Sequence, residues 1–103
     1  MSELISILGA GESGVGSAIL AQKQGFDVWV SDYNQIQPKY KAELDKYGIK
    51  YEENGHNEML IKSSSKIIKS PGISDKSPIV VAATSANIPI VSEIEFAVNY
   101  TNA

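Results

Sequence analysis

Three glycines and one aspartate have the types and the spacing of a nucleotide-binding site. Gly9, Gly11 and Gly14 form a G-x-G-x-x-G pattern directly after an apolar segment, and Asp32 ends the next apolar segment. In such a loop the first glycine permits a tight turn, the second lets the backbone approach a ligand, and the third lets a helix lie close to a strand. We expect Gly16 to assist this close packing. The start of the helix would offer free N–H groups and the positive end of its dipole to a phosphate.

An acidic residue inside this loop complicates the interpretation. Glu12 would lie beside a bound diphosphate, which costs about 1 kcal/mol or less if the carboxylate is solvated. We expect its side chain to point to water, where the helix dipole stabilises it. If the diphosphate lies further along the helix start, Glu12 would instead contact a sugar hydroxyl. A short glycine pattern also occurs in packing turns that bind nothing, which is the competing interpretation.

Other residues that could do chemistry have simpler explanations. His56 is the only histidine, and one histidine in a chain without cysteine makes a poor metal site, so we expect a polar turn residue here. Glu93 and Glu95 are two positions apart on a predicted helix and do not face each other, so we expect no catalytic residue here. Glu95 fits a capping box with Ser92. We expect Lys69, at the end of a predicted strand, to be solvated.

The elements that must position these residues alternate between strand and helix. Apolar segments predict strands at Leu4–Leu8, Val28–Val30, Ile49–Glu52, Lys66–Lys69 and Ile88–Val91. Helices are predicted at Ser13–Gln24, Gln37–Tyr47, Glu58–Ser63, Pro78–Ala86 and, after the cap Ser92, to about Tyr100. Asn57 and Ser77 are expected to cap the third and fourth helices. This alternation predicts an α/β fold in one domain, 1–103. The fold is a Rossmann-like five-stranded parallel sheet, order 3-2-1-4-5, with helices on both faces and a crevice where strands 1 and 4 end.

Composition narrows the class of protein. The 103 residues carry a formal net charge of −3, and all nine basic residues are lysines, which argues against a nucleic-acid partner and removes the bidentate arginine clamp for phosphate. The absence of cysteine excludes disulfides and cysteine-ligated zinc. No signal peptide and no apolar run approaching about 20 residues is visible. We therefore expect a cytoplasmic domain that does not bind membranes. We also expect it to be a monomer.

Four further segments resemble one family. They read GAGESGVG from Gly9, SPGI from Ser70, A-x-x-x-x-I-P-I-V ending at Val91, and SEIEFA from Ser92. Together they closely resemble the N-terminal domain of the Mur ligases of bacterial peptidoglycan synthesis, and the D-glutamate-adding branch more than the L-alanine-adding branch. The resemblance covers nearly the whole chain. It implies that the domain holds the UDP part of UDP-N-acetylmuramoyl-L-alanine rather than NAD.

The resemblance also implies roles for particular residues. The glycine loop and Ser13 would meet the diphosphate, the segment from Asp32 to Asn34 would lie by the uridine, and the segment from Ser70 to Gly72 would form the other wall of the uracil slot. Several relatives carry a hydroxyl residue and an arginine where this chain has Tyr33 and Asn34, so Tyr33 either stacks or donates to the base, or is a half-exposed aromatic at a strand end. The residues assigned to UDP binding are Gly9, Gly11, Glu12, Ser13, Gly14, Asp32, Tyr33, Asn34, Ser70, Pro71 and Gly72.

The implied reaction needs parts that this sequence does not contain. Mur ligases carry an ATPase domain with a phosphate loop and then a C-terminal domain, and no G-x-x-x-x-G-K-[ST] pattern occurs here. We therefore interpret the chain as the first domain of an ADP-forming amide ligase, inactive alone, with the remaining ligase domains as its partners in cis. The resemblance implies that the parent enzyme uses ATP and Mg²⁺ to form an acyl phosphate, which the amine of D-glutamate displaces.

Two other interpretations remain at this point. The first is an NAD-binding module of an oxidoreductase or a nucleotide-sensing regulator, in which Asp32 would take the ribose hydroxyls. The second is an interaction domain with an empty glycine loop. The NAD-binding interpretation leaves the SPGI and SEIEFA segments unexplained.

Overall fold

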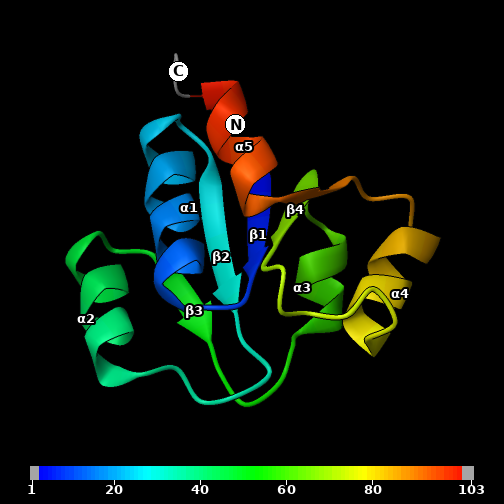
Figure 1. Ribbon diagram of the computed structural model, residues 1–103, viewed down its shortest axis with the longest axis horizontal. Coiled ribbons are helices and arrows are strands. Elements are labelled where there is room, and N and C mark those ends of the chain that lie inside the picture. The colour runs from blue at the N-terminus through cyan, green and yellow to red at the C-terminus, as the bar shows by residue number, and fades with distance from the viewer. Residues whose placement is uncertain (1–2, 101–103) are drawn as a thin grey trace.

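One five-stranded sheet with helices on both faces makes up the computed structural model, which describes residues 3–100 (Figure 1). The strands are all parallel, in the order β3-β2-β1-β4-β5, as predicted. They are β1 Leu4–Leu8, β2 Asp27–Ser31, β3 Lys50–Glu52, β4 Lys66–Lys69 and β5 Ile90–Ser92. The helices are α1 Glu12–Lys23, α2 Pro38–Lys46, α3 Glu58–Lys62, α4 Pro78–Ser85 and α5 Glu93–Tyr100. The predicted domain 1–103 includes residues 1–2 and 101–103, which lie outside the described range.

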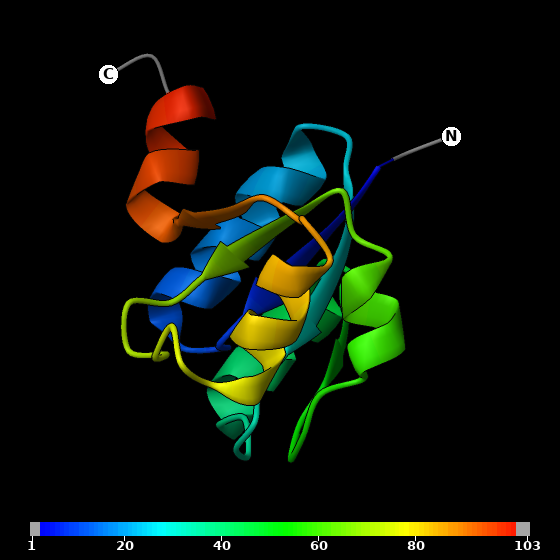
Figure 2. The ribbon, with the colours of Figure 1, turned by 90° about the vertical axis from the view of Figure 1, so that its right-hand side faces the viewer.

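The two faces of the sheet have separate apolar cores. Helices α1, α2 and α5 cover one face, and α3 and α4 cover the other; in Figure 2, α4 lies in front of the sheet and α1 behind it. Successive strand residues point to opposite faces. Ile5 and Ile7 of β1 therefore pack with the first group of helices, while Leu8 packs with the second. Burial on both faces explains why the central strand β1 is an almost continuous apolar run.

The element boundaries follow local chemistry. β5 begins at Ile90, later than predicted, because Pro89 has no N–H to donate to the ladder. Asn57 caps α3 by accepting a hydrogen bond from the N–H of Leu60, as predicted. The N–H of Glu95 donates to Ser92 Oγ at 3.0 Å, which confirms the first half of the capping box. Ser77 is the N-cap residue of α4 and Pro78 its first residue, as predicted, but the Ser77 hydroxyl makes no cap hydrogen bond. No helix within residues 3–100 has the length and apolar character needed to cross a membrane.

Close packing in the glycine loop places α1 against the end of β1. Gly9 has φ +101°, a backbone conformation that other residues rarely adopt. A Cβ atom on Gly14 would overlap the carbonyl oxygen of Gly9, so the loop closes only if position 14 has no side chain. The expectation that Gly16 serves the same purpose is wrong, because it is exposed and a Cβ there would meet nothing within 4 Å.

Two alanine substitutions should therefore have opposite effects on stability. Gly14→Ala forces an atom into an occupied space, so we expect it to lower the free energy of unfolding by about 1–3 kcal/mol or more. Gly16→Ala fills open space on the same helix, so we expect it to stabilise the chain by up to roughly 1 kcal/mol through helix propensity. Urea unfolding followed by circular dichroism measures both values. Equal effects of the two substitutions would show that Gly14 is not a packing constraint.

Candidate functional site

The predicted site residues lie at the carboxyl edge of the sheet. Because neighbouring parallel strands end at one edge, the glycine loop after β1, Asp32 after β2 and Ser70 after β4 come together. The N–H of Ser70 donates to the carbonyl oxygen of Leu8 at 3.1 Å. A Cβ atom on Gly9 would lie 3.0 Å from the Cβ of Ser70, so the glycine loop and the loop that follows β4 are in direct contact.

The start of α1 presents free backbone N–H groups at this edge. The first hydrogen bond of the helix runs from the N–H of Val15 to the carbonyl oxygen of Gly11 at 3.0 Å. The N–H groups of the preceding helical residues, Glu12, Ser13 and Gly14, therefore have no partner within the helix. Gly11 is exposed, and a Cβ there would meet nothing within 4 Å. The side chains of Glu12 and Ser13 are also exposed. This arrangement can accept an anion.

Asp32 holds the glycine loop in place. Its Oδ2 accepts a hydrogen bond from the N–H of Ala10 at 2.8 Å, and its Oδ1 accepts one from the N–H of Asn34 at 2.9 Å. One carboxylate therefore joins the loop after β1 to the loop after β2. The sequence predicted a ligand-binding role for Asp32 and missed this structural one, because the partner N–H of Ala10 is 22 positions away.

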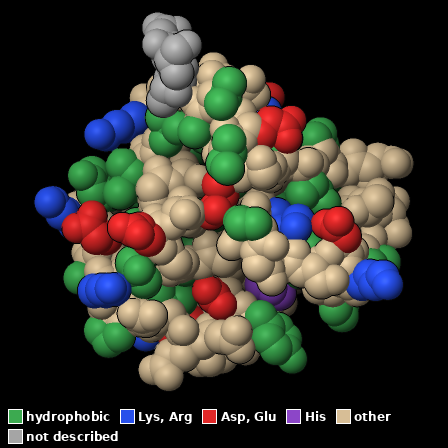
Figure 3. Space-filling model, viewed as in Figure 1, with side chains coloured by type: hydrophobic (Ala, Val, Ile, Leu, Met, Phe, Trp, Pro, Cys, Tyr) green, Lys and Arg blue, Asp and Glu red, His purple; other side chains and the backbone are tan. Residues whose placement is uncertain are grey.

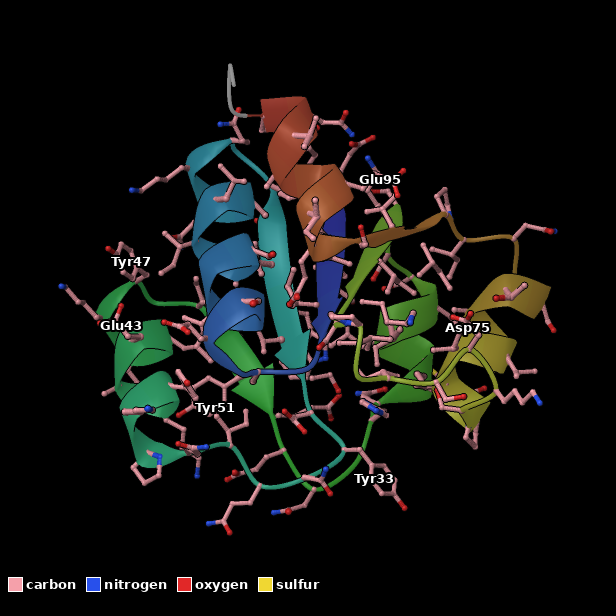
Figure 4. All side chains as sticks on the ribbon, viewed as in Figure 1. Tyr33, Glu43, Tyr47, Tyr51, Asp75 and Glu95 are labelled. Atoms are coloured by element: carbon pink, nitrogen blue, oxygen red, sulfur yellow. The ribbon has the colours of Figure 1, made fainter. Side chains whose placement is uncertain are left out.

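The loop after β2 is anchored by the segment after β3. Glu53 accepts a hydrogen bond from the N–H of Ile36 at 2.8 Å and pairs with Lys41 at 2.5 Å. These two donors, the Lys41 ammonium first, hold the pKa of the Glu53 carboxyl below its usual value. Tyr33 is 73% exposed and, as Figure 4 shows, lies at the end of this loop away from α2. Its ring can meet a ligand without any change in the core.

His56 was predicted to be a polar turn residue, but in the structure its ring is held by a buried hydrogen-bond partner. Its Nδ1 lies 2.6 Å from the hydroxyl of Ser31, which is completely buried. The same hydroxyl donates to Glu52 Oε2 at 2.7 Å, and that oxygen also accepts from the indole N–H of Trp29 at 3.1 Å. The ring centroids of His56 and Tyr33 are 6.1 Å apart. His56 therefore belongs to a polar cluster behind the loop that carries Tyr33.

This cluster determines the tautomer of His56. The Ser31 hydroxyl has one proton and gives it to the Glu52 carboxylate, so it can only accept from His56. Nδ1 must then carry the ring proton, and Nε2 of the neutral ring is left as an acceptor. Burial lowers the pKa of His56, and the opposing charges of Glu52 and Asp32 offset this only in part, which favours the neutral ring.

Lys69 fastens the loop that contains Ser70, Pro71 and Gly72. Its ammonium donates to the carbonyl oxygen of Ile73 at 2.7 Å and lies 3.3 Å from Asp75. The expectation of a solvated lysine is wrong, because this side chain is only 17% exposed. The lysine crosses the base of the loop and keeps it compact, while Pro71 and Gly72 remain exposed.

Glu93 is a buried carboxyl group that sequence reasoning dismissed. It is the first residue of α5, it is 8% exposed, and its Oε2 has no hydrogen-bond partner among the described residues. Burial raises the pKa of this carboxyl. It lines a cavity of about 390 Å³ together with Ser13 and Pro71. The sequence did contain one indication that Glu93 lies near the site: it directly follows β5, and β5 ends at the same edge of the sheet as the glycine loop.

The charges on the face of the molecule shown in Figure 3 argue against an anion site built from lysine side chains. Figure 3 shows acidic side chains near the centre of the face and lysine side chains mostly toward its edges. Within residues 3–100, no group of three or more His, Cys, Asp or Glu side chains is arranged to hold a metal ion. Any anion bound here would depend on backbone N–H groups.

The fold and the glycine loop define a Rossmann-like, doubly wound α/β domain. A family model described as "Mur ligase MurD-like, N-terminal domain" matches residues 3–92, and the chain therefore belongs to that family. A UDP-N-acetylmuramoylalanine–D-glutamate ligase of Porphyromonas gingivalis (strain W83) is 59% identical over 99 residues. The enzyme of that name from Bacteroides fragilis (strain YCH46) is 50% identical over 99 residues. Each match covers 96% of this chain and 22% of the relative.

Solved structures of ligases share the fold. A pseudomurein peptide ligase type C from Methanothermus fervidus superimposes with a TM-score of 0.83 and 24% identity over 97% of this chain and 21% of that one. UDP-N-acetylmuramate-alanine ligase MurC from Thermotoga maritima superimposes with a TM-score of 0.77 and 24% identity, over 91% of this chain and 21% of that one. At this identity the likeness is one of fold.

The polar cluster yields a prediction about His56. At pH 7 we expect a neutral ring with its proton on Nδ1, because the Ser31 hydroxyl can only accept. Long-range ¹H–¹⁵N correlation spectra distinguish the two tautomers from the ¹⁵N shifts of the ring. Ser31→Ala removes the acceptor and should shift the population toward the Nε2-protonated form. A ring protonated on Nε2 in the unaltered chain would contradict the assignment.

Proposed function

We propose that this domain binds the UDP part of UDP-N-acetylmuramoyl-L-alanine and anchors it for an ATP-dependent ligase that adds D-glutamate during peptidoglycan synthesis. The observation that carries the proposal is the start of α1, where Glu12, Ser13 and Gly14 offer free N–H groups beside the open position at Gly11. The names of the relatives supply the substrate. The helix dipole and these N–H groups bind the diphosphate.

The uridine lies on the β2 side of the free N–H groups at the start of α1. Tyr33 and Asn34 are exposed there, and the loop from Ser70 to Gly72 is in contact with the glycine loop on the other side. The exposed ring of Tyr33 offers a face for the base. Asp32 adds to the site by fixing the loops, and its remaining lone pairs accept from the nucleoside.

Anchoring is the contribution of this domain to the reaction. Binding energy gained at the remote UDP group positions the reacting carboxylate in the rest of the ligase. The chain contains no phosphate-loop pattern, and no metal-binding group occurs within the described range, so its residues do not fit ATP or Mg²⁺. ATP binding, ADP formation and amide formation belong to the remaining domains of a cytoplasmic parent enzyme, and this chain alone is inactive.

An NAD-binding role is less well supported. Such a role would have Asp32 accept the ribose hydroxyls of the dinucleotide. It leaves the SPGI and SEIEFA segments unexplained, and the family model that matches residues 3–92 describes a Mur ligase domain.

A titration followed by amide NMR tests the proposal. UDP should shift the resonances of Gly11 to Gly14, Asp32 to Asn34 and Ser70 to Gly72, whereas NAD at the same concentration should shift them little. Gly11→Ala should weaken UDP binding without unfolding the chain, because its Cβ enters the space that the ligand needs and its φ is −84°. Gly16→Ala is the matched control. Shifts at these positions with NAD and none with UDP would overturn the proposal.

A further inference from the structure

The loop between β3 and α3 carries an asparagine that is followed by a glycine. Asn54 is exposed, and its φ of +60° lies in the left-handed region, which asparagine tolerates better than most residues. Gly55 has φ +136°, a conformation that favours glycine. The fold therefore favours glycine at position 55 and leaves the side chain of the preceding asparagine in solvent.

This loop holds the loop after β2, which contains Tyr33. The N–H of Asn54 donates to the carbonyl oxygen of Asn34 at 3.1 Å, and the N–H of Gly55 donates to the carbonyl oxygen of Asp32 at 3.3 Å. The two loops lie side by side below the sheet in Figure 1. The second bond is longer than is usual for an N–H donor, so the Gly55 nitrogen is only weakly held.

An exposed asparagine before a glycine can undergo a reaction that needs no enzyme. Once a base removes its proton, the Gly55 nitrogen attacks the side-chain carbonyl carbon of Asn54, and ammonia leaves as the new C–N bond closes a cyclic imide. Water then opens the imide at either of its carbonyl groups and gives aspartate or isoaspartate. Glycine has no side chain to hinder the attack.

We propose that Asn54 is a site of spontaneous deamidation, and that the isoaspartate product releases the loop that carries Tyr33. In isoaspartate the backbone runs through the former side chain and gains a methylene group between the N–H groups of residues 54 and 55. These N–H groups then no longer match the spacing of the carbonyl oxygens of Asn34 and Asp32. The inference needs no bound ligand, and only its effect on UDP binding rests on the proposed function.

Either product also adds a negative charge beside the candidate site. Asn54 directly follows Glu53 and lies against the loop that begins at Asp32. A further carboxylate here repels a bound diphosphate, but water and salt screen a charge at an exposed position. The longer backbone is therefore the larger effect. Asn54→Asp separates the two effects, because it carries the charge on a backbone of normal length.

The chain contains a matched control for the reaction. Asn87 is also exposed and has φ +61°, but Ile88 follows it. The branched side chain of isoleucine crowds the nitrogen that would have to attack. Asn54 should therefore react while Asn87 does not, although the two asparagines have the same backbone conformation.

Mass spectrometry of an aged chain, kept in slightly alkaline buffer, tests the site. Digestion after lysine places Asn54 in the peptide 51–62 and Asn87 in the peptide 77–103, and chromatography separates the aspartate and isoaspartate forms. We expect most of Asn54 to be converted before Asn87 changes measurably, with isoaspartate as the main product. Acidic buffer should slow the conversion, because the attacking nitrogen must lose its proton. Similar conversion of both residues, or none at Asn54, would overturn the proposal.

Amide NMR tests the effect of the product on the loop. The resonances of Asp32 to Asn34 should move in the aged chain. Asn54→Gly, which accepts the left-handed backbone and cannot react, should keep its spectrum when it is aged in the same way. Freshly prepared Asn54→Asp should shift these resonances less than ageing does. If it reproduces every shift of the aged chain, charge alone explains them and the release of the loop is overturned.

Calorimetry with UDP then connects the loop to the proposed function. The isoaspartate form should bind UDP about fivefold more weakly than the fresh chain, or worse, which corresponds to the loss of one hydrogen bond. Aged Asn54→Gly should keep its affinity. Unchanged affinity of the isoaspartate form, in a chain that binds UDP when fresh, would contradict the release of the loop. If the fresh chain does not bind UDP, the proposed function fails, while the mass and amide spectra alone decide the deamidation.

Discussion

The carboxylate of Asp32 is the interaction on which the candidate site depends. By accepting the N–H groups of Ala10 and Asn34, it joins the loop after β1 to the loop after β2 at the edge of the sheet. Charge-assisted hydrogen bonds of this kind are stronger than neutral ones. The position of the glycine loop, and with it the start of α1, is therefore set by a side chain from the loop that follows the neighbouring strand β2.

With the glycine loop held in this position, the groups that remain to bind a ligand are mostly backbone N–H groups. Gly9 and Gly14 let α1 approach the end of β1, and the first turn then presents N–H groups that no carbonyl of the helix can pair with. An acidic chain without arginine can bind a diphosphate in this way, because helix N–H groups and the helix dipole carry partial positive charge wherever the fold places them. Lys69 and Glu53 contribute indirectly by holding the loops on either side.

Local patterns in the sequence predicted the fold, and they failed where distant residues meet. The strand order followed from alternating apolar and helical segments. The glycine pattern located the loop because Gly9 has a positive φ and a Cβ on Gly14 would overlap the carbonyl oxygen of Gly9, which is close in the sequence. His56 could not be interpreted this way, since its partner Ser31 is 25 positions away. Glu93 was dismissed because its spacing from Glu95 excluded a catalytic pair, although its burial depends on α1 and the loop after β4. Gly16 was predicted to allow close helix packing because it follows the glycine pattern, but it lies on the exposed face of α1, which the pattern alone does not indicate.

Scalar couplings across hydrogen bonds between amide groups and ³¹P would test the central claim most directly. With UDP bound to ¹⁵N-labelled chain, the account predicts ³¹P couplings to amides among Glu12, Ser13 and Gly14, the groups without partners in the first turn of α1. Couplings from the diphosphate only to amides elsewhere in the chain, with UDP demonstrably bound, would contradict it.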